Sequence, residues 1–345
     1  MDIYTERSER QDLANEAKLS QADLNGYAFP KLFPIITDLE RSGVLSYAPV
    51  GLTAASGTKG RKNGAALDVT EIKTVDIPWN VARIEGRTKI FASEVKGFGG
   101  IEVADKFGGE DAARRVFNTI EKDAYTLVFS TARADGAVSL ANRKIRTLIS
   151  KAAIAKRRWG KAYLVMTTNG VIKFAQIPEV IEAAIGRFGA TAINMLNDPD
   201  QNNVANAIAI LIGFQGIILF DSEIVGNDKD DYIAVAALRP ELFGADNMAV
   251  RMGIKRMATY AFTMIYLPDP ANPDTPFSMK SHPNDMEKAN YYDAECFSSL
   301  NEIHATDGAE PANPNGGAIA LFKMLADANG YTGAPVQVVN PPPAP

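Results

Sequence analysis

Residues 108–136, GGEDAARRVFNTIEKDAYTLVFSTARADG, predict one long helix. Their apolar residues recur every three or four positions, which is the spacing of one helix face: Ala113, Val116, Phe117, Ile120, Ala124, Leu127 and Val128. The charged residues fall mostly on the opposite face: Arg114, Arg115, Glu121, Lys122 and Asp123. Glu110 and Asp111 lie in the first turn, where the helix dipole favours carboxylates. Glycines at 108, 109 and 136 are expected to mark the helix boundaries.

The composition is that of a globular protein. The chain has 345 residues, of which 46% are hydrophobic and 22% charged, enough for two domains or one elaborated domain. The net charge of −5 argues against a dedicated nucleic-acid binder, because neutralising phosphates requires a basic surface. The single cysteine, Cys296, excludes an internal disulfide framework and favours a reducing compartment.

The ends and the apolar runs predict a soluble, cytosolic protein without a membrane span. The first residues are charged, so no signal peptide is expected. The most apolar run, residues 204–220, is short for a transmembrane helix and contains Asn206 and Gln215.

The segment before the long helix reads as an arm followed by a projection. Residues 1–25 are polar, and Pro30 and Pro34 divide the apolar segment that follows into short pieces. Residues 51–66, GLTAASGTKGRKNGAA, form a basic, glycine-rich tip that lacks the residue order of a phosphate-binding loop. Residues 67–95 are strand-like but carry charges on both faces, which predicts a ribbon covered by a neighbouring subunit. An ordinary edge hairpin on the parent sheet remains the alternative.

The second half of the chain alternates helix and strand patterns. A basic helix is expected at 140–158, and its charged face reads more simply as solvated than as bound to nucleic acid. Strands are expected at 162–168, 217–224, 232–243 and 256–267, and helices at 177–188, 204–214 and 318–329. The Pro-rich segment up to residue 285 is predicted to be irregular, and one strand could return to the core within 295–308. The end of the chain is predicted to be an extended or disordered tail.

No catalytic, cofactor or metal site is predicted. The chain lacks the nucleophile-elbow, HExxH and dinucleotide-binding motifs. Cys296, His282 and His304 match no zinc spacing, and packing roles suit them better than a nucleophile–base pair of Cys296 with His304. The acidic turn with Asp228, Asp230 and Asp231 lacks the spacing of a calcium loop and reads as solvated. These patterns favour a structural role.

The order of these parts resembles the major capsid proteins of tailed bacteriophages with the Hong Kong 97-like fold, to which encapsulins are related in shape. After the arm, ribbon and long helix, KRRWGKAYLVMTTNGVIKFAQ (156–176) resembles the entry to the family's axial domain. GIILFDSEIVGNDKDDYIAVAALRPELFGADNMAVR (216–251) resembles its later strands. The Pro-rich region from Pro268 and the helix near Leu321 depart from the pattern.

The resemblance implies an α+β fold with a spine helix at residues 110–134. It divides the chain into an N-terminal arm at 1–50, an extended loop at 51–95, a peripheral domain with the spine helix at 96–158, an axial domain at 159–255, a return to the peripheral domain at 256–310, and a C-terminal helix and Pro-rich tail at 311–345.

The resemblance also implies a function: hexamers and pentamers that form an icosahedral shell around double-stranded DNA, in the virion, after assembly in the host cytoplasm. The implied partners are further copies of the chain, a separate scaffolding protein, a portal protein and DNA held by weak non-specific contact, with a decoration protein left open. The implied contacts between subunits involve Lys59, Arg61 and Lys62 at the loop tip, Trp79 and Phe91 as anchors on an adjacent spine helix, and Arg114 and Arg115.

Three alternatives stay open at this point. An encapsulin-type nanocompartment would share the fold and differ in its contents. A phage tail or adaptor component would be another structural protein. A cytosolic α/β enzyme would need polar residues that converge at strand ends, for which the sequence offers Asp221, Glu223 and Arg239.

Overall fold

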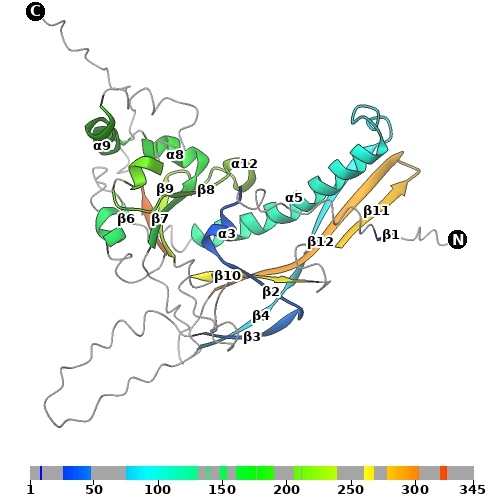
Figure 1. Cartoon of the computed structure of the whole chain (residues 1–345), viewed down its shortest axis with the longest axis horizontal. Helices are drawn as coiled ribbons and strands as arrows, with labels where there is room; N and C mark the ends of the chain where they lie inside the picture. Colours follow the sequence, from blue (N-terminus) through cyan, green and yellow to red (C-terminus); the bar gives the residue numbers. More distant parts are fainter. Residues whose placement is uncertain are drawn as a thin grey trace, which may run out of the picture.

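The protein has an α+β fold with one long helix and two main sheets (Figure 1). The computed structural model describes residues 8–9, 26–47, 75–130, 138–139, 148–153, 161–175, 177–189, 206–210, 212–238, 260–267, 278–302 and 319–324. None of the helices in these segments is long and apolar enough to cross a bilayer. The presence of a long helix beside two mixed sheets confirms the predicted α+β class.

The long helix, α5, spans Ile101–Val128 and is 28 residues long. It starts before the predicted residue 110 and ends before the predicted residue 134, so both predicted ends were wrong. Glycines 108 and 109 lie inside the helix and do not bound it. The helix begins instead after Gly99 and Gly100, whose φ angles of 92° and 133° suit glycine. Gly108 serves packing, because a Cβ there would lie 2.3 Å from the ring of Tyr292.

One face of a six-stranded sheet packs against α5. The strand order is β1-β11-β12-β10-β2, with β5 also paired to β12. Their bounds are Ser8–Glu9 for β1, Ser278–Asn284 for β11, Ala289–Glu302 for β12, Ala261–Tyr266 for β10, Ile35–Asp38 for β2 and Ala82–Phe91 for β5. Because α5 and β12 are both long and lie side by side, they form an elongated body (Figure 1).

Alternation along β5 and β12 decides which residues face the helix. Thr88 and Ile90 of β5 and Tyr292 and Cys296 of β12 are buried beneath α5. Gly86 permits the closest approach, since a Cβ there would lie 2.1 Å from the carbonyl oxygen of Ala112. The other face of these strands is left open.

Two expectations about this sheet were wrong. The segment around Pro283 was predicted to be irregular, but β11 is a strand paired with β12, and Pro283 lies beyond the residues of β11 that pair with β1. The end of the predicted ribbon is β5, which pairs with β12 from Ala82 to Phe91. For this part of the ribbon the alternative, an edge strand of the parent sheet, is correct.

The second sheet has the order β6-β13-β9-β7-β8. The strands are β6 Val138–Ser139, β13 Ile319–Lys323, β9 Tyr232–Leu238, β7 Lys161–Thr167 and β8 Ile217–Phe220. The helices α8 Thr168–Ala175, α9 Pro178–Phe188 and α12 Ser222–Val225 belong to the same part of the chain. The predicted strands at β7 and β9 and the predicted helix at α9 are confirmed. The strand predicted at 217–224 is confirmed only as far as Phe220, because Ser222–Val225 form the helix α12.

The predicted helix at 318–329 was wrong. Its first residues form β13, which pairs antiparallel with β9. A short apolar run fits either secondary structure, and here pairing with a distant strand decides it. Residues beyond 324 lie outside the described segments, as does the predicted tail.

A smaller two-stranded sheet joins β3, Ser42–Tyr47, to β4, Val75–Asn80. Before it, the short helix α3, Phe29–Leu32, lies on α5, with Pro30 in its first turn as prolines prefer. The prediction that prolines break this segment into short pieces is confirmed.

Candidate functional site

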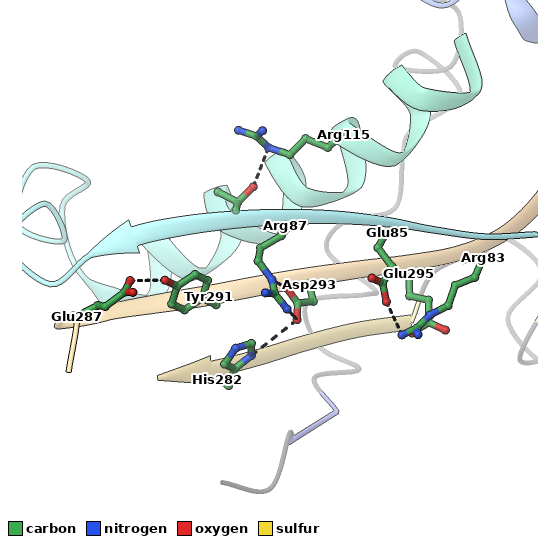
Figure 2. A network of polar contacts seen from close by, with 10 residues as sticks. Arg83, Glu85, Arg87, Arg115, His282, Glu287, Tyr291, Asp293 and Glu295 are labelled. Atoms are coloured by element: carbon green, nitrogen blue, oxygen red, sulfur yellow. Dashed lines mark hydrogen bonds and ion pairs between the residues drawn. The ribbon is translucent and has the colours of Figure 1, made fainter. Parts of the chain in front are cut away.

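The side of β5, β12 and β11 that faces away from α5 carries a row of charged and aromatic residues, here called the open face. Strand alternation places nine residues on it: Arg83, Glu85, Arg87 and Lys89 from β5, Tyr291, Asp293 and Glu295 from β12, and Lys280 and His282 from β11. Figure 2 shows most of these side chains along the three strands. The strand register sets their pairing, because Asp293 lies opposite both Arg87 and Lys280.

Ion pairs cross between these strands. Arg87 donates two hydrogen bonds to Asp293, from Nε to Oδ1 at 2.6 Å and from Nη2 to Oδ2 at 2.8 Å (Figure 2). Such a two-pronged contact fixes orientation as well as charge. Arg83 Nη2 donates to Glu295 Oε2 at 2.7 Å and also lies 2.5 Å from Glu85 Oε1.

One end of the open face is partly aromatic. The ring of His282 stacks on Tyr291 with centroids 5.4 Å apart, and its Nδ1 lies 3.9 Å from Asp293 Oδ2. Glu287 accepts hydrogen bonds from Lys89 and Tyr291, and these bonds lower the pKa of that carboxyl group. The ammonium group of Lys89 lies 4.4 Å from the ring centroid of Phe91.

The charges of the open face balance once the adjacent turn is included. Its four cations, Arg83, Arg87, Lys89 and Lys280, stand beside its three anions, Glu85, Asp293 and Glu295, and Glu287 from the turn between β11 and β12 pairs with Lys89 as the fourth anion. A balanced, strand-borne surface offers no excess positive charge to phosphates and suits contact with another protein.

The structure places Trp79 in the interior of the chain. Its ring is 5% exposed and packs with Phe262 and Met264, and a Cβ on Gly43 would touch it at 2.9 Å. The chain itself therefore covers most of the residue predicted to anchor the loop on a neighbour, and its contact with a second subunit stays a prediction.

Phe91, Arg114 and Arg115 lie on or beside the long sheet and helix. Phe91 is 41% exposed at the end of β5, and Arg114 is exposed on α5. Arg115 Nε donates to Asp111 at 2.9 Å and to Thr88 Oγ1 at 3.3 Å, which joins α5 to β5 within one chain. Partial burial raises the pKa of Asp111, but hydrogen bonds from Thr88 and Arg115 outweigh burial and lower it overall. The loop-tip residues lie outside the described segments: Lys59, Arg61 and Lys62.

Exposed apolar residues at the start of α5 were missed from the sequence. Ile101, Val103 and Phe107 are 59%, 52% and 48% exposed, and the ring of Phe107 contacts Phe98 with centroids 5.1 Å apart. These four residues are here called the apolar cluster. Because the helix was expected to begin at residue 110, Ile101, Val103 and Phe107 were not recognised as helical surface, although their apolar character was visible in the sequence.

The residues considered for chemistry have structural partners. Thr167 Oγ1 donates to Asp230, Lys173 pairs with Asp231 at 2.7 Å, and Tyr125 donates to Asp228 at 2.8 Å. The solvated reading of Asp230 was therefore wrong, since it is buried. Within the segments that the structure describes, no group of three or more His, Cys, Asp or Glu residues could hold a metal ion.

Two other residues that were considered as catalytic candidates, Asp221 and Cys296, also have structural roles. Asp221 caps the start of α12 by accepting from the backbone N–H of Glu223, so its carboxylate has a structural role. Cys296 is buried beneath α5, and burial raises the pKa of its thiol to about 12. Arg239 and His304 lie outside the described segments.

Comparison with known proteins finds likeness only among solved structures, since no family model and no curated protein matches the chain. A phage-related protein from Bordetella bronchiseptica RB50 is 13% identical, with a TM-score of 0.55 over 92% of this chain and 97% of that one. Two likenesses have TM-scores of 0.46: the capsid of an empty GTA particle, 10% identical over 87% of this chain and 90% of that one, and a virus-like particle from Pyrococcus furiosus, 9% identical over 91% and 97%. The chain therefore shares its fold with a phage-related protein, as the predicted resemblance to phage capsid proteins requires.

Proposed function

We propose that this chain is the major capsid protein of a tailed bacteriophage, a non-enzymatic subunit that assembles into hexamers and pentamers of an icosahedral shell. One observation carries the proposal: a 28-residue helix laid along a long sheet whose other face is open, in a fold shared with a phage-related protein. A subunit of this shape has large flat surfaces that copies of itself can cover.

In this proposal the parts take the roles of a Hong Kong 97-like capsid protein. Helix α5 is the spine helix, and it forms the peripheral domain at 96–158 and 256–310 together with β10, β11 and β12, to whose sheet the arm adds β1 and β2 and the extended loop adds β5. The second sheet belongs to the axial domain at 159–255, to which β13 from the C-terminal segment adds a strand. Strand β4 belongs to the extended loop at 51–95, and it pairs with β3, which lies in the N-terminal arm at 1–50.

The surfaces available for assembly differ in chemistry. The apolar cluster offers hydrophobic surface that a second copy would remove from water. The open face offers balanced charges that fix the orientation of a neighbour more than they add affinity. The same pattern of residues supports assigning seven side chains to contacts between subunits: Lys59, Arg61 and Lys62 at the loop tip, and Trp79, Phe91, Arg114 and Arg115.

The proposed partners follow from the role. A separate scaffolding protein, a portal protein and packaged double-stranded DNA would meet the shell in the host cytoplasm, and the mature chain would lie in the virion. The net charge of −5 suits a wall that holds DNA by weak, non-specific contact.

Native mass spectrometry of the purified chain tests the proposal. It should detect complexes of five and six copies at low salt, and a variant that removes apolar surface at the start of α5 should reduce them. A chain that stays monomeric or dimeric at all concentrations, even with a scaffolding protein supplied, would contradict the proposal. Shells that contain an enzyme and no DNA would instead identify a nanocompartment.

A further inference from the structure

Glu121 is a carboxylate buried in the middle of α5. It is 1% exposed, so the prediction that Glu121 lies on the polar face of the helix was wrong. It stands four residues after Phe117 and three before Ala124, so helical spacing puts it on the core face. A buried carboxylate on an apolar face is costly unless other groups compensate its charge.

The partners of Glu121 come from a segment more than ninety positions earlier in the chain. The backbone N–H of Ala28 donates to Oε1 at 2.8 Å, and that of Phe29 donates to Oε2 at 2.9 Å. These donors lie at the start of α3, whose own N-cap residue makes no side-chain hydrogen bond. The carboxylate of Glu121 therefore acts as the N-terminal cap of this short helix. Residues 26–33, which include α3, are here called the strap.

The rest of the strap is held to α5 by apolar and aromatic contacts. Phe29 and Phe33 are fully buried, and the ring of Phe29 stacks on Phe117 with centroids 6.1 Å apart. Tyr27 donates a hydrogen bond to Asn118 Oδ1 at 3.1 Å. The strap is therefore packed on α5, and Glu121 is a buried ionisable group in that contact.

The charged groups around Glu121 only partly balance it. Lys31 of α3 favours the ionised form, whereas Asp221 at the start of α12 disfavours it. On α5 itself, Tyr125 lies one turn further on and directs its hydroxyl to Asp228. Among the described residues, no lysine or arginine forms an ion pair with Glu121.

Two effects compete at this carboxylate, and burial is the larger. Burial disfavours the charged form, whereas the two backbone N–H groups and Lys31 favour it, and the pKa of Glu121 is raised from 4.5 to about 7. A carboxyl group released into water by an undocked strap would return to its ordinary pKa. Between these two values the docked state binds a proton that the undocked state lacks, so docking is favoured as pH falls.

We propose that Glu121 is a proton-operated latch, which docks the strap more tightly on α5 when protonated and releases it more readily when ionised. Protonation leaves one oxygen as acceptor for a backbone N–H and removes the buried negative charge. Opening of the strap at higher pH lets water reach the carboxylate. The latch thus couples the junction between the N-terminal segment and the body of the subunit to pH.

Hydrogen exchange of the strap, measured on the full-length protein between pH 5.5 and 8.5, tests the latch. After correction for the intrinsic pH dependence, protection of the Ala28 and Phe29 amides should fall about thirtyfold over this range in the wild type, given pKa values of 7 and 4.5 for the two states. Glu121→Gln cannot ionise, so its protection should not depend on pH. Glu102→Gln, on an exposed position of the same helix, should behave as the wild type.

A third variant keeps the test independent of how well Glu121→Gln folds. Lys31 is exposed, so Lys31→Gln leaves the core intact while it removes a nearby positive charge. The midpoint of the change in protection should then move to higher pH. A wild type whose strap protection is independent of pH, or a Lys31→Gln midpoint that does not rise, would overturn the proposal.

Discussion

Gly108 shows how a single residue sets the distance between α5 and the sheet beneath it. The helix passes so close to β12 that a Cβ at this position would lie 2.3 Å from the ring of Tyr292. That ring is fully buried, and its hydroxyl donates to Asp105 of the same helix. The glycine therefore allows the tyrosine to lie beneath the helix axis.

Gly108→Ala is expected to destabilise the protein by about 1–3 kcal/mol, because overpacking against a fixed ring outweighs the helix propensity that alanine gains. Urea unfolding of the subunit measures the change. The matched control is Gly186→Ala in α9, where a Cβ would meet nothing within 4 Å, and which should stabilise by about 0.5–1 kcal/mol. Equal effects of the two substitutions would contradict this account of Gly108.

The thiol of Cys296 is expected to be unreactive in the folded protein. It is buried under α5, and burial raises its pKa to about 12, so almost no thiolate exists at pH 8. A thiol-specific reagent should label one cysteine per chain in guanidinium chloride and almost none without it. Rapid labelling of the native protein at pH 8 would show that α5 does not cover this position.

At the scale of elements, the register of β5 against β12 accounts for the open face. Arg87 meets Asp293 because the two residues are directly paired across the strands. Both side chains retain contact with solvent, so the pair fixes register more than it adds stability.

Arg87→Glu is expected to lower the free energy of unfolding by about 1 kcal/mol, since it places two carboxylates opposite each other. The double variant Arg87→Glu with Asp293→Arg should recover most of this loss. Urea unfolding at low salt and in 1 M salt measures both, and the recovery should shrink at high salt. Lys96→Glu, in the exposed turn before α5, serves as the charge-matched control and should change stability little. No recovery in the double variant would argue against the pairing.

Elements that form through local contacts could be predicted from the sequence, whereas elements that form through pairing of distant segments could not. The long helix, β7 and α9 follow local periodicity and were predicted. Strands β11 and β13 form through pairing with residues far along the chain, which no local pattern reveals. At the candidate site, the charges of β5 were visible, but their partners on β12 depend on a register that sequence alone does not give.

The burial of Glu121 also could not be predicted from local sequence patterns alone. Its spacing placed it on the core face, whereas its residue type suggested solvent, and only the strap explains how the carboxylate is accommodated. Trp79 is the converse case, because a large aromatic residue assigned to a neighbouring subunit is packed inside its own chain.

At the scale of the whole molecule, the apolar cluster is a surface through which we expect one copy of the chain to contact another. A double substitution of Ile101→Ser and Val103→Ser is expected to raise the concentration needed for assembly about tenfold or more, because each side chain would lose apolar surface buried by a second copy. Light scattering against protein concentration measures this threshold. Glu102→Gln, between the two positions, should leave it unchanged. Assembly by the serine variant at the wild-type threshold would remove the cluster from the interface.

Electron microscopy of the purified protein, with a scaffolding protein supplied and its solution mass measured beside it, tests the central claim most directly. The account predicts closed shells, or pentamers and hexamers that convert into them, with α5 and the long sheet in the wall. A protein that remains strictly monomeric or dimeric at high concentration would contradict it.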